Sequence, residues 1–150
     1  MDQSSFYRVI DEFQKLPGII DELSVDSFTS VMQSNEAKEA KNIVYLWRTN
    51  KKISRLNGES DILYIGQTKN SFATRYKNHH QWINTKANSL KYLKAIKGFN
   101  GISIYTCDFT KFGETLLKAE GQLLWWYFQN HCEYPPFNYT KTKIRNDYYP

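Results

Sequence analysis

Two tyrosines, an arginine and a histidine between residues 42 and 80 are the side chains best suited to act on a phosphate. Tyr45 and Tyr64 each lie in a short apolar stretch of the kind that forms a β-strand. Arg75 and His79 are four residues apart, so a helix would present both on one face. An arginine donates to two phosphate oxygens at once, and a histidine exchanges protons near neutral pH. Each residue alone is more simply explained by the core or the surface, but the group indicates a phosphate site.

Glu120 is the acidic residue whose surroundings are unusual. Its neighbours are almost all apolar: Leu116, Leu117, Ala119, Leu123 and Leu124. Carboxylates are rarely buried unless they are paired or bound to a metal. Mg²⁺ needs only one or two carboxylates, since waters and substrate phosphates supply its other ligands. Glu114 lies closer to the start of the same expected helix, where an acidic residue simply stabilises the helix dipole.

Histidines and cysteines leave one alternative and one ambiguity. A zinc site would draw on His79, His80, His131, Cys107 and Cys132, but their spacing fits no common zinc pattern. Two cysteines are also too few for a disulfide framework, so reduced thiols are expected. His80 lies one helical turn from Tyr76 and competes with His79 for the role of functional imidazole.

Composition favours a single soluble domain with an anionic partner. The chain has 150 residues, a net charge of +5 and a pI of about 9.1, which makes nucleic acid the first candidate partner and a neutral basic surface the alternative. Aromatic residues make up 16% and can either fill a core or stack on bases. The N-terminus has no secretory leader, and the longest apolar run, 123–128, is too short to span a bilayer. We therefore expect a cytoplasmic protein without a membrane partner.

Periodicity predicts an alternation of helices and three strands. Helices are expected over 4–16, 19–32, 72–83, 89–97 and 112–130, with 34–41 as a helical extension or a connector. Strands are expected over 43–47, 61–66 and 101–107. Gly66 is expected where the chain bends sharply or lets another group approach the backbone. The fold class is α/β (α+β), with helices around a small three-stranded sheet that contains an antiparallel hairpin.

The expected elements divide the chain into two parts. Residues 1–41 form an N-terminal helical extension packed on the core, and residues 42–150 form the main domain. Inside the main domain, the hairpin has a long polar connection from residue 49 to residue 60. Asn57-Gly58 provides the turn signal within that connection.

Six residues in order along the chain resemble the GIY-YIG nuclease family over roughly residues 42–140. Ile43-Val44-Tyr45 stands at the first motif, and Tyr64-Ile65-Gly66 followed by Gln67-Thr68 matches the second. The remaining positions of the set are Arg75, His79, Glu120 and Asn138. The chain departs from the family where Asn42 stands near a frequent glycine, where Val44 alters the usual order, and where the link between the tyrosines is longer.

The resemblance implies metal-dependent hydrolysis of a DNA phosphodiester. Glu120 would hold one divalent ion, Mg²⁺ with Mn²⁺ as a substitute. Tyr45 would deprotonate the attacking water with help from His79. Arg75 and Tyr64 would stabilise charge on the phosphate, and Asn138 would brace the site. A phenol acts as a base only if nearby cations lower its pKa from about 10.

Compact members of the family include type II restriction endonucleases, so the resemblance implies an enzyme of that type that acts on double-stranded DNA as a possible homodimer. A repair or mobile-element nuclease with little sequence preference is the alternative within the same family. A non-catalytic nucleic-acid-binding module that stacks bases on sheet aromatics is the alternative outside it. The basic residues expected to contact DNA come from the long hairpin link, from the segment after the second strand and from the helix over 89–97: Lys51, Lys52, Arg55, Lys69, Lys91 and Lys94.

Overall fold

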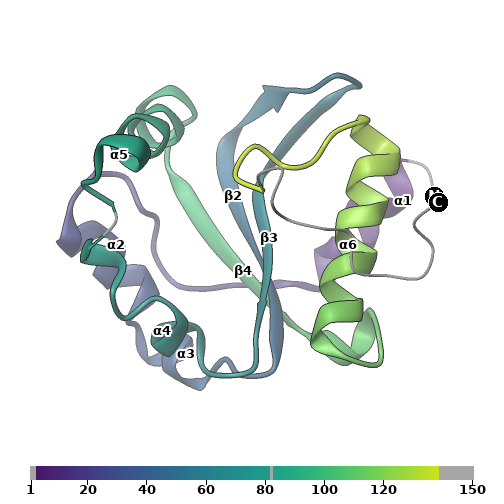
Figure 1. Cartoon of the computed structure of the whole chain (residues 1–150), viewed down its shortest axis with the longest axis horizontal. Coiled ribbons are helices and arrows are strands. Elements are labelled where there is room, and N and C mark those ends of the chain that lie inside the picture. The colour runs from purple at the N-terminus through teal and green to yellow at the C-terminus, as the bar shows by residue number, and fades with distance from the viewer. Residues whose placement is uncertain (1–2, 82, 139–150) are drawn as a thin grey trace.

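An antiparallel sheet of four strands separates two layers of helices (Figure 1). The computed structural model describes residues 3–81 and 83–138. The strand order is β1-β4-β2-β3. The strands span Gln14–Lys15 (β1), Ile43–Ser54 (β2), Glu59–Thr68 (β3) and Ile102–Asp108 (β4). The α/β class is confirmed, whereas the expected number of three strands is wrong.

The additional strand, β1, replaces the end of the first expected helix. Helix α1 covers only Gln3–Val9 and is followed by a 3-10 turn, Ile10–Glu12. The chain is extended from Phe13 onward, and the Leu16 amide donates to the Ile104 carbonyl at 2.8 Å. Pairing with β4 therefore overrides the helical spacing of the apolar residues. The N-terminal region thus adds a strand to the sheet as well as helices.

The expected long connection of the hairpin is mostly strand. The register runs to Ser54 opposite Glu59, with irregularities between Trp47 and Arg48 and between Arg48 and Ile53. A tight turn closes the hairpin, where the Arg55 amide donates to the Gly58 carbonyl at 2.9 Å and Gly58 has φ +73°. The polar sequence indicated a loop because this part of the hairpin extends beyond the apolar core.

Alternate residues of the central strands face different helical layers. Tyr45 and Trp47 of β2 face the layer of α2 (Val25–Met32), α3 (Asn35–Glu39), α4 (Phe72–Arg75) and α5 (Lys86–Leu93). Val44 and Leu46 face α1 and α6 (Leu116–His131) (Figure 1). A π-helical turn, Lys94–Gly98, continues α5. The two sheet faces therefore have separate cores.

The helix expected over 72–83 is wrong. Helix α4 ends at Arg75, since Tyr76 leaves the helical conformation with φ −113° and ψ 20°. A separate 3-10 turn follows at His79–Gln81, and another lies at Phe109–Lys111 before α6. The Thr115 side chain caps α6 by accepting from the Lys118 amide. Residues 139–150 of the expected main domain lie outside the described residues.

Within the described part of the chain, no helix has the length and apolar character that a membrane-spanning segment needs.

Candidate functional site

Gly66 is the point at which the two motif tyrosines meet. It lies on β3 directly opposite Tyr45 on β2. A Cβ atom at Gly66 would be 2.6 Å from Cζ of Tyr45 and 2.7 Å from Cε1 of Tyr64. The centroids of the two rings are 6.0 Å apart. The expected close approach at Gly66 is confirmed, and the groups that approach are these rings. The strand continues beyond Gly66 to Thr68.

Tyr45 shares a hydrogen bond with a tyrosine that the motif did not indicate. Its hydroxyl lies 2.7 Å from the Tyr76 hydroxyl, and the Tyr45 side chain is buried at 1% exposure. Burial, followed by the neighbouring Tyr64 phenol, raises the pKa of Tyr45. The hydrogen bond to Tyr76 and the charge of Arg75 lower it by less. This direction is opposite to the one that a general base at neutral pH needs.

Arg75 brings a permanent positive charge to the tyrosines. It occupies the last residue of α4 and is exposed. Its guanidinium carbon lies 4.9 Å from the centroid of the Tyr76 ring. The charge of Arg75 also acts on the ionisation of Tyr45. The cation and the two phenols, Tyr45 and Tyr64, thus belong to one electrostatic group.

His79 is held by the protein on both sides of its ring. Its Nδ1 lies 2.6 Å from the Tyr76 carbonyl oxygen, and its Nε2 lies 3.2 Å from Oγ1 of Thr29. The ring stacks on Phe28 and is 2% exposed. The expectation that Arg75 and His79 share a helix face is wrong because α4 ends at Arg75. His79 faces α2 instead.

His80 is the exposed imidazole of the pair. Its ring centroid lies 6.2 Å from that of His79, nearly perpendicular to it. Solvent can reach His80, whereas His79 is enclosed. Exposure therefore distinguishes the two imidazoles, which the sequence could not separate.

Glu120 is buried in α6, as its apolar neighbours indicated, with 7% of its surface exposed. Its charge raises the pKa of Tyr45 slightly, so the carboxylate belongs to the same electrostatic environment. Among residues 3–81 and 83–138, no group of three or more histidine, cysteine or acidic side chains could hold a metal. A single carboxylate still fits Mg²⁺, which takes most of its ligands from phosphate and water.

Asn138 is bound to the backbone next to the second motif. Its Oδ1 accepts from the Ile65 amide at 2.9 Å, and its Nδ2 donates to the Ile65 carbonyl at 3.0 Å. The Phe137 amide donates to the Leu63 carbonyl at 2.8 Å. Residues 137 and 138 thus bind the edge of β3 at Leu63 and Ile65. Asn138 is therefore placed to hold the part of β3 that carries Tyr64 and Gly66.

The six basic residues expected to contact DNA divide into separate groups. Lys51, Lys52 and Lys69 are exposed, and Lys69 lines a cleft of about 450 Å³ together with Lys38 and Lys41. Arg55, Lys91 and Lys94 line a groove of about 270 Å³.

Arg55 is already engaged by the protein. It forms an ion pair with Glu133 and donates from its guanidinium to the Tyr134 carbonyl at 2.8 Å. These contacts join the hairpin turn to the end of α6. The guanidinium of Arg55 thus has a structural role at the hairpin turn.

A cleft of about 340 Å³ adjoins the tyrosines and was not expected from the sequence. Tyr64, Arg75 and Tyr76 line it together with Lys91. Its other aromatic lining comes from Trp47, Tyr92 and Phe137. The high aromatic content was the only sequence signal for such a cleft, since its residues come from distant segments.

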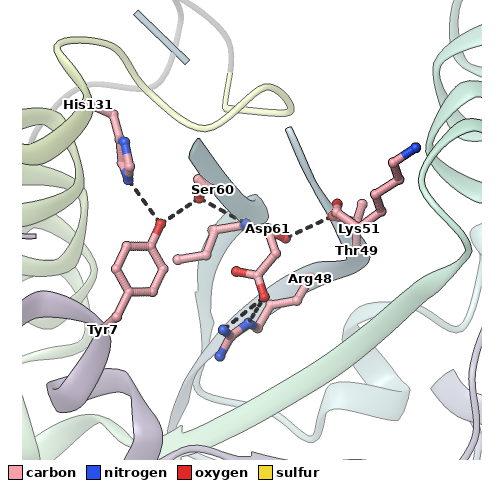
Figure 2. A network of polar contacts seen from close by, with 8 residues as sticks. Tyr7, Arg48, Thr49, Lys51, Ser60, Asp61 and His131 are labelled. Carbon is pink, nitrogen blue, oxygen red and sulfur yellow. Dashed lines mark hydrogen bonds and ion pairs between the residues drawn. The ribbon is translucent and has the colours of Figure 1, made fainter. Parts of the chain in front are cut away.

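A second buried polar group lies near the hairpin turn (Figure 2). The Tyr7 hydroxyl is 2.6 Å from Oγ of Ser60 and 2.9 Å from Nε2 of His131. His131 Nδ1 lies 2.8 Å from the Asn57 carbonyl oxygen. Ser60 and His131 are almost fully buried and bind other groups of the protein. This group connects α1, β3 and α6 and is structural.

Comparisons with known proteins found no matching family model, no similar curated protein and no similar solved structure. Functional inference therefore depends on the geometry around Gly66.

Proposed function

We propose that this chain is a metal-dependent DNA endonuclease with a GIY-YIG-like fold. The observation that carries the proposal is the close packing of Tyr45 and Tyr64 on Gly66, with Arg75 beside them. Packing of the hydrophobic core does not by itself explain why the positive charge of Arg75 lies next to the phenols of Tyr45 and Tyr64. Preorganised donors of this kind stabilise the charge that develops on a phosphate during hydrolysis.

Each residue has a defined part in this proposal. Arg75 and Tyr64 bind the phosphate oxygens, and Tyr45 donates from its protonated hydroxyl. Asn138 holds the backbone of Ile65 and so fixes the positions of Tyr64 and Gly66. Glu120 is the residue that would hold Mg²⁺ or Mn²⁺. When bound, such an ion supplies positive charge to the phosphate.

His79 acts indirectly in this proposal. Its Nδ1 contacts the carbonyl of Tyr76, whose hydroxyl meets Tyr45. It is therefore a positioning residue for the tyrosine pair. The assisting role in proton transfer that the resemblance implied has no geometric support, since both ring nitrogens face protein groups.

We further propose a restriction-type enzyme that acts on double-stranded DNA. One site cuts one strand, so a double-strand break requires a homodimer or two successive cuts. A repair or mobile-element nuclease would use the same residues with little sequence preference. Sequencing the ends produced from genomic DNA separates the two, because discrete ends support restriction and scattered ends support the alternative.

A non-catalytic nucleic-acid-binding module is the second candidate function. The raised pKa of Tyr45 and the aromatic cleft beside Tyr64 favour it. Incubation of supercoiled plasmid with the protein and Mg²⁺, Mn²⁺ or EDTA decides between the two. Nicked or linear DNA that requires the metal supports the nuclease. Plasmid left intact at all salt concentrations and pH values, despite binding, supports the module.

A further inference from the structure

The cleft beside Tyr64 has aromatic walls that fix one another. The ring centroids of Trp47 and Tyr76 are 5.5 Å apart, and those of Trp47 and Tyr92 are 6.0 Å apart. Phe137 meets Tyr92 edge to face at 5.4 Å. Trp47, Tyr76 and Tyr92 are each at most 5% exposed, whereas Phe137 is half-buried at the rim. Trp47, Tyr76 and Tyr92 therefore support the cleft from beneath, and the partly exposed rings of Tyr64 and Phe137 supply its aromatic surface.

Two cations stand at the rim of this cleft. Arg75 lies over the Tyr76 ring, with 4.9 Å between its guanidinium carbon and the ring centroid. Lys91 lies over the Phe137 ring, with 4.8 Å between Nζ and the centroid. Asn88, one turn before Lys91 on α5, adds an amide that both donates and accepts. The cleft thus combines exposed aromatic surface with positive charge at its mouth.

These features match a nucleotide more closely than other ligands. Bases stack on aromatic side chains with little dependence on sequence, and cations beside the stack bind the flanking phosphates. The volume of about 340 Å³ lies within the usual range for small-ligand pockets, roughly 300–1,000 Å³. A paired base cannot enter because its partner strand covers its edge and its neighbours cover its faces.

We propose that this cleft binds one unpaired nucleobase of the DNA substrate, next to the phosphate held by Arg75 and Tyr64. The base stacks on the partly exposed rings of Tyr64 and Phe137, Asn88 contacts its edge, and Lys91 binds the adjacent phosphate. The proposal rests on the proposed nuclease function and adds that one nucleotide at the cleavage point is unpaired when the protein is bound. The unpaired base comes either from a single strand or from a nucleotide that leaves a duplex.

Equilibrium binding in EDTA tests the cleft without any cleavage. Four fluorescently labelled probes of equal length are compared: a single strand, a duplex with one bulged nucleotide, a duplex with one mismatch, and a fully paired duplex. Wild-type protein is expected to bind the single strand and the bulge about tenfold more tightly than the paired duplex, as expected for one stacked base. Intermediate affinity for the mismatch would show that the cleft also captures a base from a weakened pair. Equal affinity for all four probes would overturn the proposal.

Phe137→Leu removes an aromatic wall while keeping an apolar side chain of similar size. It is expected to remove the preference for unpaired probes and to leave binding to the paired duplex unchanged. Lys97→Ala is the matched control, because Lys97 is exposed near the end of the same helical segment and does not line the cleft. It should retain the full preference. A variant Phe137→Leu that is folded by circular dichroism and keeps the preference would contradict the proposal.

The two proposals fail in different ways. A wild-type protein that shows no preference for unpaired bases but cleaves plasmid in a metal-dependent way would reject the base cleft and keep the nuclease. A preference for unpaired bases without cleavage under any condition would reject the nuclease and leave a binding protein with a base cleft.

Discussion

The absence of a side chain at residue 66 determines how the two motif tyrosines pack. The rings of Tyr45 and Tyr64 occupy the space in which a Cβ atom would lie. If a Cβ atom were added at residue 66, the packed rings could make room for it only by a shift of the strand or a change of their rotamers. Gly66 is therefore a packing requirement of the site.

We expect Gly66→Ala to lower the free energy of unfolding by about 1–3 kcal/mol, the usual cost of overpacking. Urea denaturation measures this change. Gly98→Ala is the matched control, since a Cβ there meets only the flexible side chain of Lys94, at 3.6 Å. That substitution is expected to be neutral or stabilising by about 0.4–1 kcal/mol. Equal effects of the two variants would refute the packing role of Gly66.

The protonation state of Tyr45 leads to a prediction for cleavage kinetics. A phenol with a raised pKa stays protonated from pH 6 to 9, so it contributes as a donor. Removing a donor with Tyr45→Phe is expected to slow cleavage about tenfold, whereas removing a general base costs about 10²–10⁴-fold. The rate profiles of wild type and variant should be parallel over this pH range. If Tyr45 were the base, the wild-type rate would rise about tenfold per pH unit and the variant rate would not.

At the scale of elements, tertiary pairing explains where the sequence patterns failed. Regular alternation or helical spacing identified the cores of β2, β3, β4 and α6, because their apolar residues face a core on at least one side. Gln14–Lys15 is a strand only through its pairing with β4, which is far away in sequence. The hairpin extension beyond Arg48 was missed for another reason: its strands pair with each other beyond the apolar core, so their sequence is polar.

The candidate site was predictable to a similar extent. The burial of Glu120 followed from its apolar neighbours and is confirmed. Tyr76, in contrast, was indistinguishable from a core aromatic before the fold was known. The position of His79 was predicted from a continuous helix, and it failed because α4 is a single turn. The local sequence pattern thus identified candidate residues of the site, but it could not predict the direction in which their side chains point.

The hairpin turn and α6 are joined by the buried polar group of Figure 2, which makes stability depend on pH. Burial lowers the pKa of His131 below its ordinary value of 6.5. The unfolded chain then binds a proton more readily than the folded chain as pH falls below 6.5. Stability from this residue is therefore present above pH 6.5 and decreases as the solution is acidified.

Urea denaturation at pH 7.5 and pH 5.5 measures this dependence. Wild-type protein is expected to be less stable at pH 5.5. His131→Gln should reduce the difference between the two pH values, whatever its effect on stability at pH 7.5. His80→Gln, which changes an exposed imidazole, should keep the full difference. An unchanged difference in the His131 variant would show that another group is responsible.

At the scale of the whole molecule, the two helical layers place an acidic and a basic side chain on opposite sides of the sheet. Helix α6 supplies Glu120 from one layer, and α4 supplies Arg75 from the other. With a net charge of +5, the chain is suited to a polyanion. Charge alone would fit any basic protein, so the position of the cations must be tested.

DNA affinity measured between 50 and 200 mM salt provides this test. The logarithm of the binding constant is expected to fall with the logarithm of salt by about 0.9 for each phosphate contacted. Arg75→Ala should reduce the slope by about one. Arg8→Ala, an exposed arginine on α1 in the opposite layer, is the control and should leave the slope unchanged. Identical slopes for wild type and Arg75→Ala would mean that Arg75 contacts no phosphate.

The central claim, metal-dependent cleavage at the tyrosine site, is tested most directly at Glu120. Glu120→Gln keeps the size and buried position of the side chain but removes its charge, whereas Glu114→Gln changes an exposed carboxylate at the other side of the Thr115 cap. Plasmid cleavage with Mg²⁺ and DNA binding in EDTA are measured for both variants. We expect Glu120→Gln to abolish cleavage while DNA binding persists, and Glu114→Gln to behave like wild type. Undiminished cleavage by a folded Glu120→Gln variant would contradict the account.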